Sequence, residues 1–380
     1  MSPLSRFVVL YALMYAAYGV SSPFMPAFFE GRGLSPEQVG VVFGVGTAVR
    51  LVAGPLVGRI ADLTQALRAA LAICEVLAAS IALGLLSAPV FVPLFLISLG
   101  QAAALAPTTT LADALALGAA QRRRGFEYGW VRGTGSAAFV IGTLISGQLV
   151  HARGLPSIVL FQAALLVAAA GAATLVPAAA PREPVAAIEP MAHAGLVTLF
   201  GLPIFRRVML VAALVLGSHA MHDTFAVIRW SAAGISPTVA SALWSESVAA
   251  EVLVFFLVGP RLLRRRRPAS LVATAAVAGI VRWVAMASST SVLVLIVAQP
   301  LHGLTFAALH LACMRIIPAI VPPHLAATAQ AMYALGAGAT TALLTLASGW
   351  LYGALGAQGF LVMALLCAAA LPVARGLRLP

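Results

Sequence analysis

Long apolar stretches run through the chain almost from end to end, and they constrain its fold more than any other feature. A helix that crosses the hydrocarbon core of a bilayer needs about 20 apolar residues. Scanned at that length, the sequence predicts twelve spans, at residues 5–29, 36–61, 68–87, 90–117, 130–152, 155–177, 204–232, 236–259, 268–288, 291–317, 325–352 and 355–374. With 62% hydrophobic and 9% charged residues, a chain of this length has too much apolar surface for a soluble domain. We therefore expect an all-α polytopic membrane protein with twelve transmembrane helices.

An internal repeat divides the predicted spans into two sets of six. Gly33-Leu34-Ser35-Pro36 precedes the second span, and the similar Gly234-Ile235-Ser236-Pro237 precedes the eighth. At the offset between these two motifs, Arg50 in the second span falls opposite Glu251 in the eighth. We predict two pseudo-symmetric six-helix bundles. Their expected bounds are 1–177 for the amino-terminal bundle, 178–203 for a linker rich in Pro and Ala, and 204–380 for the carboxy-terminal bundle.

The positions of the arginines predict the orientation. All 23 basic residues are Arg, and their clusters, such as 122–124 and 264–267, fall at one set of span ends. The opposite loops hold only Arg32 and Arg153. By the positive-inside rule, we expect both termini and the linker to face the cytoplasm of a bacterial inner membrane. The net charge of +12 is then a property of the loops and does not indicate nucleic-acid binding.

Several motifs resemble those of the major facilitator superfamily. Gly58 and Asp62 are similar to the core of its signature after the second helix, which acts in gating, although Leu63 replaces the usual basic residue. Glu127-Tyr128-Gly129-x-x-Arg132 and Gly135-Ser136-x-x-Phe139 resemble the signature of the branch that holds lactose permease, nucleoside symporters and phenylpropionate-type permeases. The resemblance covers essentially the whole chain and implies alternating access of two bundles. It is nearest to the phenylpropionate-type permeases, through His219, Trp230, Trp244, Glu251, Arg282, Trp283, His302, His310 and Arg315.

Charged residues inside the amino-terminal spans are candidate solute contacts. An ionisable group at the bilayer centre costs about 2.5–3.5 kcal/mol on insertion scales, so it usually faces a cavity or a partner. Arg50 can pair with an anionic solute through two parallel hydrogen bonds, or it can form an internal salt bridge. The resemblance to lactose permease implies that Asp113 and Arg132 contact the solute, and a structural ion pair between them is the alternative. Phe139 falls on the same helical face as Arg132, where that permease has a stacking Trp.

The carboxy-terminal spans hold most of the groups that can exchange a proton. Glu246 has the spacing of the essential helix-eight carboxylate of lactose permease, and Glu251 fits the phenylpropionate-type pattern. A carboxyl group removed from water can exchange a proton near neutral pH, so at least one of these two is a candidate proton carrier. A permanent pair with an arginine is the alternative. Arg282 would favour the ionised carboxylate when close and the protonated form when it moves away.

Histidines in the seventh and tenth predicted spans are further candidates for proton relay. His219 and His222 lie in the seventh span, and His302 and His310 are predicted on one side of the tenth. Histidine titrates near neutral pH and can bond a solute, although a single buried histidine is often only a hydrogen-bonded core residue. Where the resemblance to lactose permease implies a proton-carrying Glu, this chain has Thr305. Threonine cannot carry a proton at physiological pH, so we expect Glu251 or Glu246 to be the proton carrier.

We predict proton symport of an aromatic or other carboxylate. A sugar or nucleoside symporter, a drug antiporter and a non-transporting receptor are the alternatives. A chain without lysine has no nucleotide-binding P-loop, and we expect no enzymatic activity, cofactor or metal. The expected partners are a small anionic solute, protons and lipid, with the protein a monomer. Predicted solute contacts are Arg50, Asp113, Arg132, Phe139, His219, Trp244 and Glu246, and predicted proton-coupling residues are Glu246, Glu251, Arg282, His302 and His310.

Overall fold

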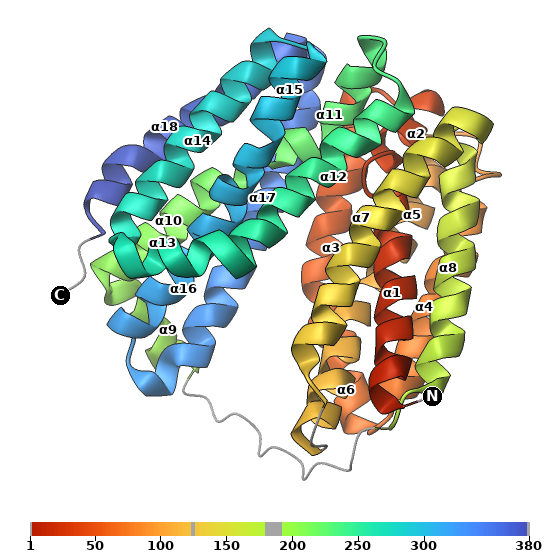
Figure 1. The fold of residues 1–380 in the computed structure, drawn as a ribbon, viewed down its shortest axis with the longest axis horizontal. Coiled ribbons are helices and arrows are strands. Elements are labelled where there is room, and N and C mark those ends of the chain that lie inside the picture. Colours follow the sequence, from red (N-terminus) through yellow and green to blue (C-terminus); the bar gives the residue numbers. More distant parts are fainter. Residues whose placement is uncertain (1, 123–125, 179–191, 378–380) are drawn as a thin grey trace. The chain divides into compact units, whose positions relative to one another are not determined.

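The computed structural model describes residues 2–122, 126–178 and 192–377, and these residues form helices and connecting turns without any strand. The chain divides into two compact units, drawn in Figure 1. The first comprises Met1–Val185 with Ser236–Ala242, and the second comprises Ala186–Ile235 with Leu243–Pro380.

The amino-terminal part of the chain holds eight helices within its described residues. They are α1 (Pro3–Ser21), α2 (Met25–Gly31), α3 (Pro36–Leu63), α4 (Leu67–Gly84), α5 (Phe91–Leu105), α6 (Thr108–Arg122), α7 (Tyr128–Arg153) and α8 (Pro156–Leu175). Ser35 and Gln38 form a capping box that starts α3. Gly33, just before this cap, has a φ of +86°, which glycine adopts far more easily than other residues. The Gly-x-Ser-Pro motif at residues 33–36 therefore marks the start of helix α3 in the structure.

The carboxy-terminal part has more irregular helices. Its elements are α9 (Ala192–Gly201), α10 (Pro203–Gly217), α11 (Ala220–Ala232), α12 (Pro237–Leu253), η1 (Val254–Val258), α13 (Gly259–Arg265), α14 (Pro268–Ser288), α15 (Val292–Ala298), η2 (Gln299–Leu301), η3 (Gly303–Ala308), α16 (Leu309–Ile320), η4 (Pro323–Leu325), α17 (Ala326–Leu355), η5 (Gly356–Gln358) and α18 (Gly359–Arg375). The segments η1 and η3 are π-helical, whereas η2, η4 and η5 are 3₁₀ turns. Helix α9 lies in the stretch expected to be a linker, and residues 179–191 of that stretch lie outside the described residues.

Three predicted spans are each built from two helices. Breaks at residues 22–24, 106–107 and 218–219 interrupt the expected spans 5–29, 90–117 and 204–232. Pro23 and Pro107 lie in the first two breaks, and proline has no backbone N–H with which to continue a helix. The third break contains no proline and places His219 at the junction of α10 and α11.

Eleven helical segments among the described residues are long and apolar enough to cross a membrane. The last one, Pro323–Arg375, has 53 residues and contains α17, η5 and α18. At about 1.5 Å per residue, a straight helix of this length would far exceed a hydrocarbon core of about 30 Å. Gly356, with a φ of +56°, turns the chain between α17 and α18. Two crossings in this segment account for the twelfth predicted span.

Helices α1 and α7 pack together closely in the first unit (Figure 1). Gly19 of α1 lies against the backbone carbonyl of Phe139, and Gly142 of α7 lies against the backbone carbonyl of Ala16. In both places even a methyl group would overlap the facing carbonyl oxygen. Small residues let transmembrane helices approach to backbone contact, where van der Waals packing is strongest. The crossing fixes α1 against the middle of α7, the helix that carries the candidate solute residues Arg132 and Phe139.

Substituting Gly142 tests this close approach. We expect Gly142→Ala to lower the thermal unfolding temperature of the purified protein, because overpacking typically costs about 1–3 kcal/mol. Gly133→Ala, on the same helix, is the matched control because a Cβ there would meet nothing within 4 Å. Alanine also favours a helix over glycine by about 1 kcal/mol. Equal unfolding temperatures for the two variants would contradict the packing interpretation.

Candidate functional site

Arg282 of α14 lies at the centre of a polar cluster in the second unit and is fully buried, with 0% exposure. Its Nη1 donates to Nδ1 of His302 at 3.0 Å. Its Nη2 donates to Oε1 of Gln299 at 2.9 Å and approaches Nε2 of His222 at 3.3 Å. The guanidinium also lies 4.7 Å from the ring centroid of Trp283. Burying a charge costs several kcal/mol unless hydrogen bonds satisfy it, and these four neighbours supply the polar and aromatic contacts that Arg282 requires.

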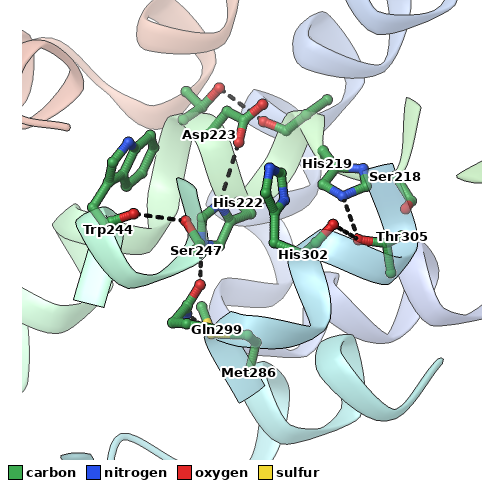
Figure 2. A network of polar contacts seen from close by, with 12 residues as sticks. Ser218, His219, His222, Asp223, Trp244, Ser247, Met286, Gln299, His302 and Thr305 are labelled. Carbon is green, nitrogen blue, oxygen red and sulfur yellow. Dashed lines mark hydrogen bonds and ion pairs between the residues drawn. The ribbon is translucent and has the colours of Figure 1, made fainter. Parts of the chain in front are cut away.

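The donor-only chemistry of arginine fixes the tautomer of His302. Guanidinium N–H groups donate and never accept, so Nδ1 of His302 must present a lone pair. A neutral His302 then carries its proton on Nε2, which lies 3.2 Å from Oε2 of Glu251. Nε2 of His222 lies near both the Arg282 donor and the acceptor Oε1 of Gln299, at 3.3 and 3.2 Å, and its Nδ1 lies 3.2 Å from Oδ1 of Asp223 (Figure 2). Two chains of contacts therefore lead from Arg282 through a histidine to a carboxylate.

Irregular helical turns place the acidic and basic members of this cluster. Glu251 lies shortly before the π-helical η1, and His302 lies immediately before the π-helical η3. Such π-helical turns inside α-helices are frequent at functional sites. Gly303 lets the two helices meet there, because a Cβ at this position would lie 2.7 Å from the carbonyl oxygen of Ala250. Gly303 thus holds His302 against the stretch of backbone that carries Glu251.

His219 is joined to Thr305 and the backbone. Its Nδ1 lies 3.1 Å from the carbonyl oxygens of both Val215 and Leu216, and its Nε2 lies 2.9 Å from Oγ1 of Thr305 (Figure 2). Since carbonyls only accept, Nδ1 carries the proton of a neutral His219, and its Nε2 presents a lone pair to the Thr305 hydroxyl. That hydroxyl has a second acceptor, the His302 carbonyl oxygen at 3.2 Å. Thr305, which replaces the glutamate that the resemblance implied, therefore orients a histidine that is 4% exposed. His219 also contacts the His302 ring edge-on, at a centroid distance of 5.1 Å.

Other predicted residues of the second unit lie around this network. The Trp244 ring stacks on His222 with centroids 5.1 Å apart. Nδ1 of His310 lies 3.4 Å from the Tyr333 hydroxyl. His310 is also in electrostatic contact with Glu251, the carboxylate that lies 3.2 Å from Nε2 of His302. Glu246 is half-buried on α12, one and a half turns before Glu251.

Arg132 and Asp113 of the first unit have separate partners. Oδ1 of Asp113 accepts hydrogen bonds from the hydroxyls of Tyr11, at 2.5 Å, and Tyr128, at 2.8 Å. The Arg132 guanidinium lies over the Tyr15 ring, 4.8 Å from its centroid. Its Nη1 is buried without a hydrogen-bond partner in the described part of the chain, where no ion pair joins it to Asp113. A buried donor without a partner costs about 1–3 kcal/mol, so Arg132 favours binding of an acceptor such as a carboxylate.

The remaining predicted residues of the first unit lie on α3 and α7. Arg50 is exposed, and its side chain makes no ion pair within the residues that the structure describes. A Cβ at Gly58 would meet nothing within 4 Å, so close helix packing does not explain that glycine. Asp62 is exposed near the end of α3. The partly buried Phe139 packs against the hydrophobic core of the first unit.

Sequence reasoning missed several polar residues that the structure brings to these places. Gln299 is fully buried and accepts from Arg282, although its amide in an apolar span, one turn before His302, was a visible signal. Tyr11 and Tyr128 were missed because their role depends on where Asp113 points. Glu75, also overlooked, is a fully buried carboxyl group in the middle of a predicted span. Like Arg50 and Glu251, it is an ionisable group inside a predicted membrane span.

Replacing the central arginine tests the architecture of the second-unit network. We expect Arg282→Lys to lower the thermal unfolding temperature, because a lysine ammonium cannot reproduce the planar fork that contacts His302, His222 and Gln299. Each lost hydrogen bond to a charged group is worth about 1.5–3 kcal/mol. Arg261→Lys is the matched control, since Arg261 is exposed and donates to a backbone carbonyl of its own helical region. Unfolding temperatures that differ from wild type by the same amount would contradict a central role for Arg282.

Comparison with known proteins identifies a family and relatives of this chain. Residues 4–362 match the MFS_1 like family. The chain is 32% identical to the probable 3-phenylpropionic acid transporter of Escherichia coli (strain K12), and the match covers 93% of each protein. It is 23% identical to the uncharacterized transporter YwbF of Bacillus subtilis (strain 168), over 90% of this chain and 85% of that protein.

Solved structures of transporters share the fold. A mutant of the nucleoside transporter NupG superposes with a TM-score of 0.87 at 18% identity, over 99% of this chain and 100% of that one. A bacterial homologue of the human lysosomal transporter Spinster gives 0.74 at 14% identity, over 98% of this chain and 95% of that one. The predicted major facilitator fold is confirmed, and the relatives are transporters rather than enzymes. The chain belongs to the MFS_1 like family and is a multi-pass secondary transporter of the major facilitator superfamily that carries a small-molecule solute.

Proposed function

We propose that this transporter couples the uptake of an aromatic carboxylate to the uptake of protons. The observation that carries the proposal is the chain of contacts from Arg282 through His302 to Glu251. These contacts connect the fixed charge of Arg282 to Glu251, a carboxyl group that can bind a proton. The solute class is supported by the unpartnered Nη1 of Arg132 and by the name of the Escherichia coli relative, a probable 3-phenylpropionic acid transporter.

Glu251 is the proposed proton carrier because it combines access to water with a link to Arg282. Its side chain is 25% exposed and that of His302 is 14% exposed, whereas Arg282 is fully buried. An ionised Glu251 accepts the Nε2 proton of His302, and that tautomer leaves Nδ1 free to accept from Arg282. Protonation of Glu251 removes the charge that holds this arrangement, so the hydrogen bonds of Arg282 respond to the proton. This is a physical route from proton binding to a change in helix packing.

Arg132 is the proposed anchor for the solute carboxylate. A guanidinium binds a carboxylate through two parallel charge-assisted hydrogen bonds, and Asp113, the carboxylate expected to pair with Arg132, is already bonded by two tyrosines. The Tyr15 ring holds the guanidinium plane in place from one side. Arg50, exposed on α3, adds positive charge that attracts an anion. Asp113 with Tyr11 and Tyr128 can alternatively bind hydroxyl groups, which is the observation that favours a sugar or nucleoside as the second candidate.

We also propose the topology that the arginines indicate. Both termini and the linker at 178–203 face the cytoplasm of a bacterial inner membrane, and the bundles at 1–177 and 204–380 alternate access to the solute in a monomer. Gly58 and Asp62 belong to the gating motif in this proposal. The positive-inside rule supports the orientation, since nearly all arginine clusters follow the same set of span ends.

Removing the proposed proton carrier should separate accumulation from exchange. We expect Glu251→Gln to abolish accumulation of 3-phenylpropionate in proteoliposomes with an acidic exterior, while solute exchange without a gradient stays measurable. The amide oxygen of Gln can still accept from His302 but cannot bind a proton at neutral pH. Glu37→Gln, at an exposed carboxylate on α3, is the control and should accumulate solute like wild type. Full accumulation by Glu251→Gln would remove Glu251 from the mechanism.

Changing the proposed anchor should weaken binding of the anion. We expect Arg132→Lys to raise the Kd for 3-phenylpropionate about 10-fold or more, because a point charge does not replace the guanidinium fork. Thermal-shift titration of purified protein measures this, with the exposed Arg59→Lys as control. Unchanged affinity in Arg132→Lys would contradict the proposed anchor. Stabilisation of the wild-type protein by nucleosides or sugars, without stabilisation by aromatic acids, would favour the second candidate.

A further inference from the structure

Glu75 is a carboxyl group buried in the first unit, away from the network around Arg282. It lies on α4 with 0% exposure. Neither of its side-chain oxygens has a hydrogen-bond partner among the described residues. Each carboxylate oxygen has acceptor capacity that native proteins almost always satisfy when the group is buried. The protonation state of Glu75 therefore requires an explanation.

The helices around α4 supply no cation to pair with Glu75. Helix α4 packs against α3, α5, α6 and α8, and the sequences of α5 and α8 contain no charged residue. The charged groups of α3 and α6 whose side chains are described are Glu37, Arg50, Arg59, Asp62 and Asp113, and none forms an ion pair with Glu75. The groups in electrostatic contact with Glu75 are the Tyr18 phenol and the Cys74 thiol. Both are uncharged at neutral pH. Arg50 is in electrostatic contact with Tyr18, but neither Arg50 nor Arg68 of α4 forms an ion pair with Glu75 among the described residues, so an ionised Glu75 would have no direct counter-charge.

We propose that Glu75 is a proton-binding site of the first unit and carries its proton in the conformation described here. An unpaired carboxylate in a medium of low dielectric constant costs several kcal/mol, and such a group becomes neutral instead. A bound metal ion would need further oxygen or nitrogen ligands, and no group of three His, Cys, Asp or Glu side chains in the described chain could supply them. A proton needs only the carboxyl group itself. This site is distinct from Glu251, which belongs to the second unit.

The phenol oxygen of Tyr18 is the acceptor for a hydrogen bond from the protonated carboxyl group of Glu75. The Thr108 hydroxyl donates to the Leu105 carbonyl at 2.6 Å, so Tyr18 donates its own proton to Oγ1 of Thr108, also at 2.6 Å. The phenol oxygen of Tyr18 then has acceptor capacity left, which it shares with Thr109, a second side chain in hydrogen-bond contact with it. Tyr18 is in electrostatic contact with Glu75, so this oxygen is the acceptor that we assign to the Glu75 O–H. Tyr18 is half-buried, whereas Glu75 is fully buried, so Tyr18 is also the more accessible of the two groups.

Infrared spectroscopy of the full chain in lipid tests the proposal. At neutral pH, the wild-type protein is expected to show the C=O stretching band of a protonated carboxylic acid, with a shift in heavy water. Glu75→Gln should remove this band, whereas the control Glu37→Gln, which changes an exposed carboxylate, should leave it unchanged. Loss of ionised-carboxylate bands in Glu75→Gln, with no loss in the protonated-acid region, would overturn the proposal.

A second variant keeps the test independent of the folding of Glu75→Gln. Tyr18→Phe retains the ring but removes the hydroxyl oxygen, so the Glu75 band should persist and move to higher wavenumber. Absence of any protonated-acid band in Tyr18→Phe and in wild type would contradict a protonated Glu75. These spectra need no solute, so they stand apart from the uptake and binding experiments, and a transporter for nucleosides would give the same bands.

Discussion

A buried guanidinium group must be surrounded by acceptors, and the second unit of this transporter is built around that requirement. Arg282 cannot accept a hydrogen bond, so each neighbour that hydrogen-bonds to it must offer a lone pair. This one-way chemistry sets the tautomer of His302 and directs its remaining proton toward Glu251. One fixed charge therefore determines how a histidine contacts a carboxylate.

Arg132, in the first unit, has a different environment from Arg282. Arg132 is held by an aromatic ring and keeps one buried donor without a partner, because two tyrosines bind Asp113, the carboxylate expected to neutralise it. Arg282 also keeps one unpartnered atom, Nε, within the described chain, but its two terminal nitrogens are bonded to His302 and Gln299. The terminal Nη1 of Arg132 has no such partner and is available to an anion, which supports a task in solute binding for Arg132 and in the response to a proton for Arg282.

Much of the fold followed from the sequence, because hydropathy is summed over about 20 residues per span and tolerates local errors. The helix breaks did not follow so easily. Prolines mark the breaks near Pro23 and Pro107, and Pro260 and Pro300 lie next to the π-helical turns, but a proline near a span does not tell which kind of helical irregularity forms. The sequence predicted that Glu251, Arg282 and His302 take part in proton coupling. It did not predict the hydrogen bonds that join them, because contacts between helices far apart in sequence depend on close approaches such as that at Gly303.

The buried carboxyl group on α4 also bears on the electrical balance of the transport cycle. A monovalent anion that enters with one proton moves no net charge across the membrane. If Glu75 exchanges its proton in each cycle as well as Glu251, one positive charge enters with each solute. The membrane potential then contributes to the driving force about 2.3 kcal/mol per charge for every 100 mV. A side chain without a hydrogen-bond partner among the described residues would thus decide whether the transporter responds to voltage.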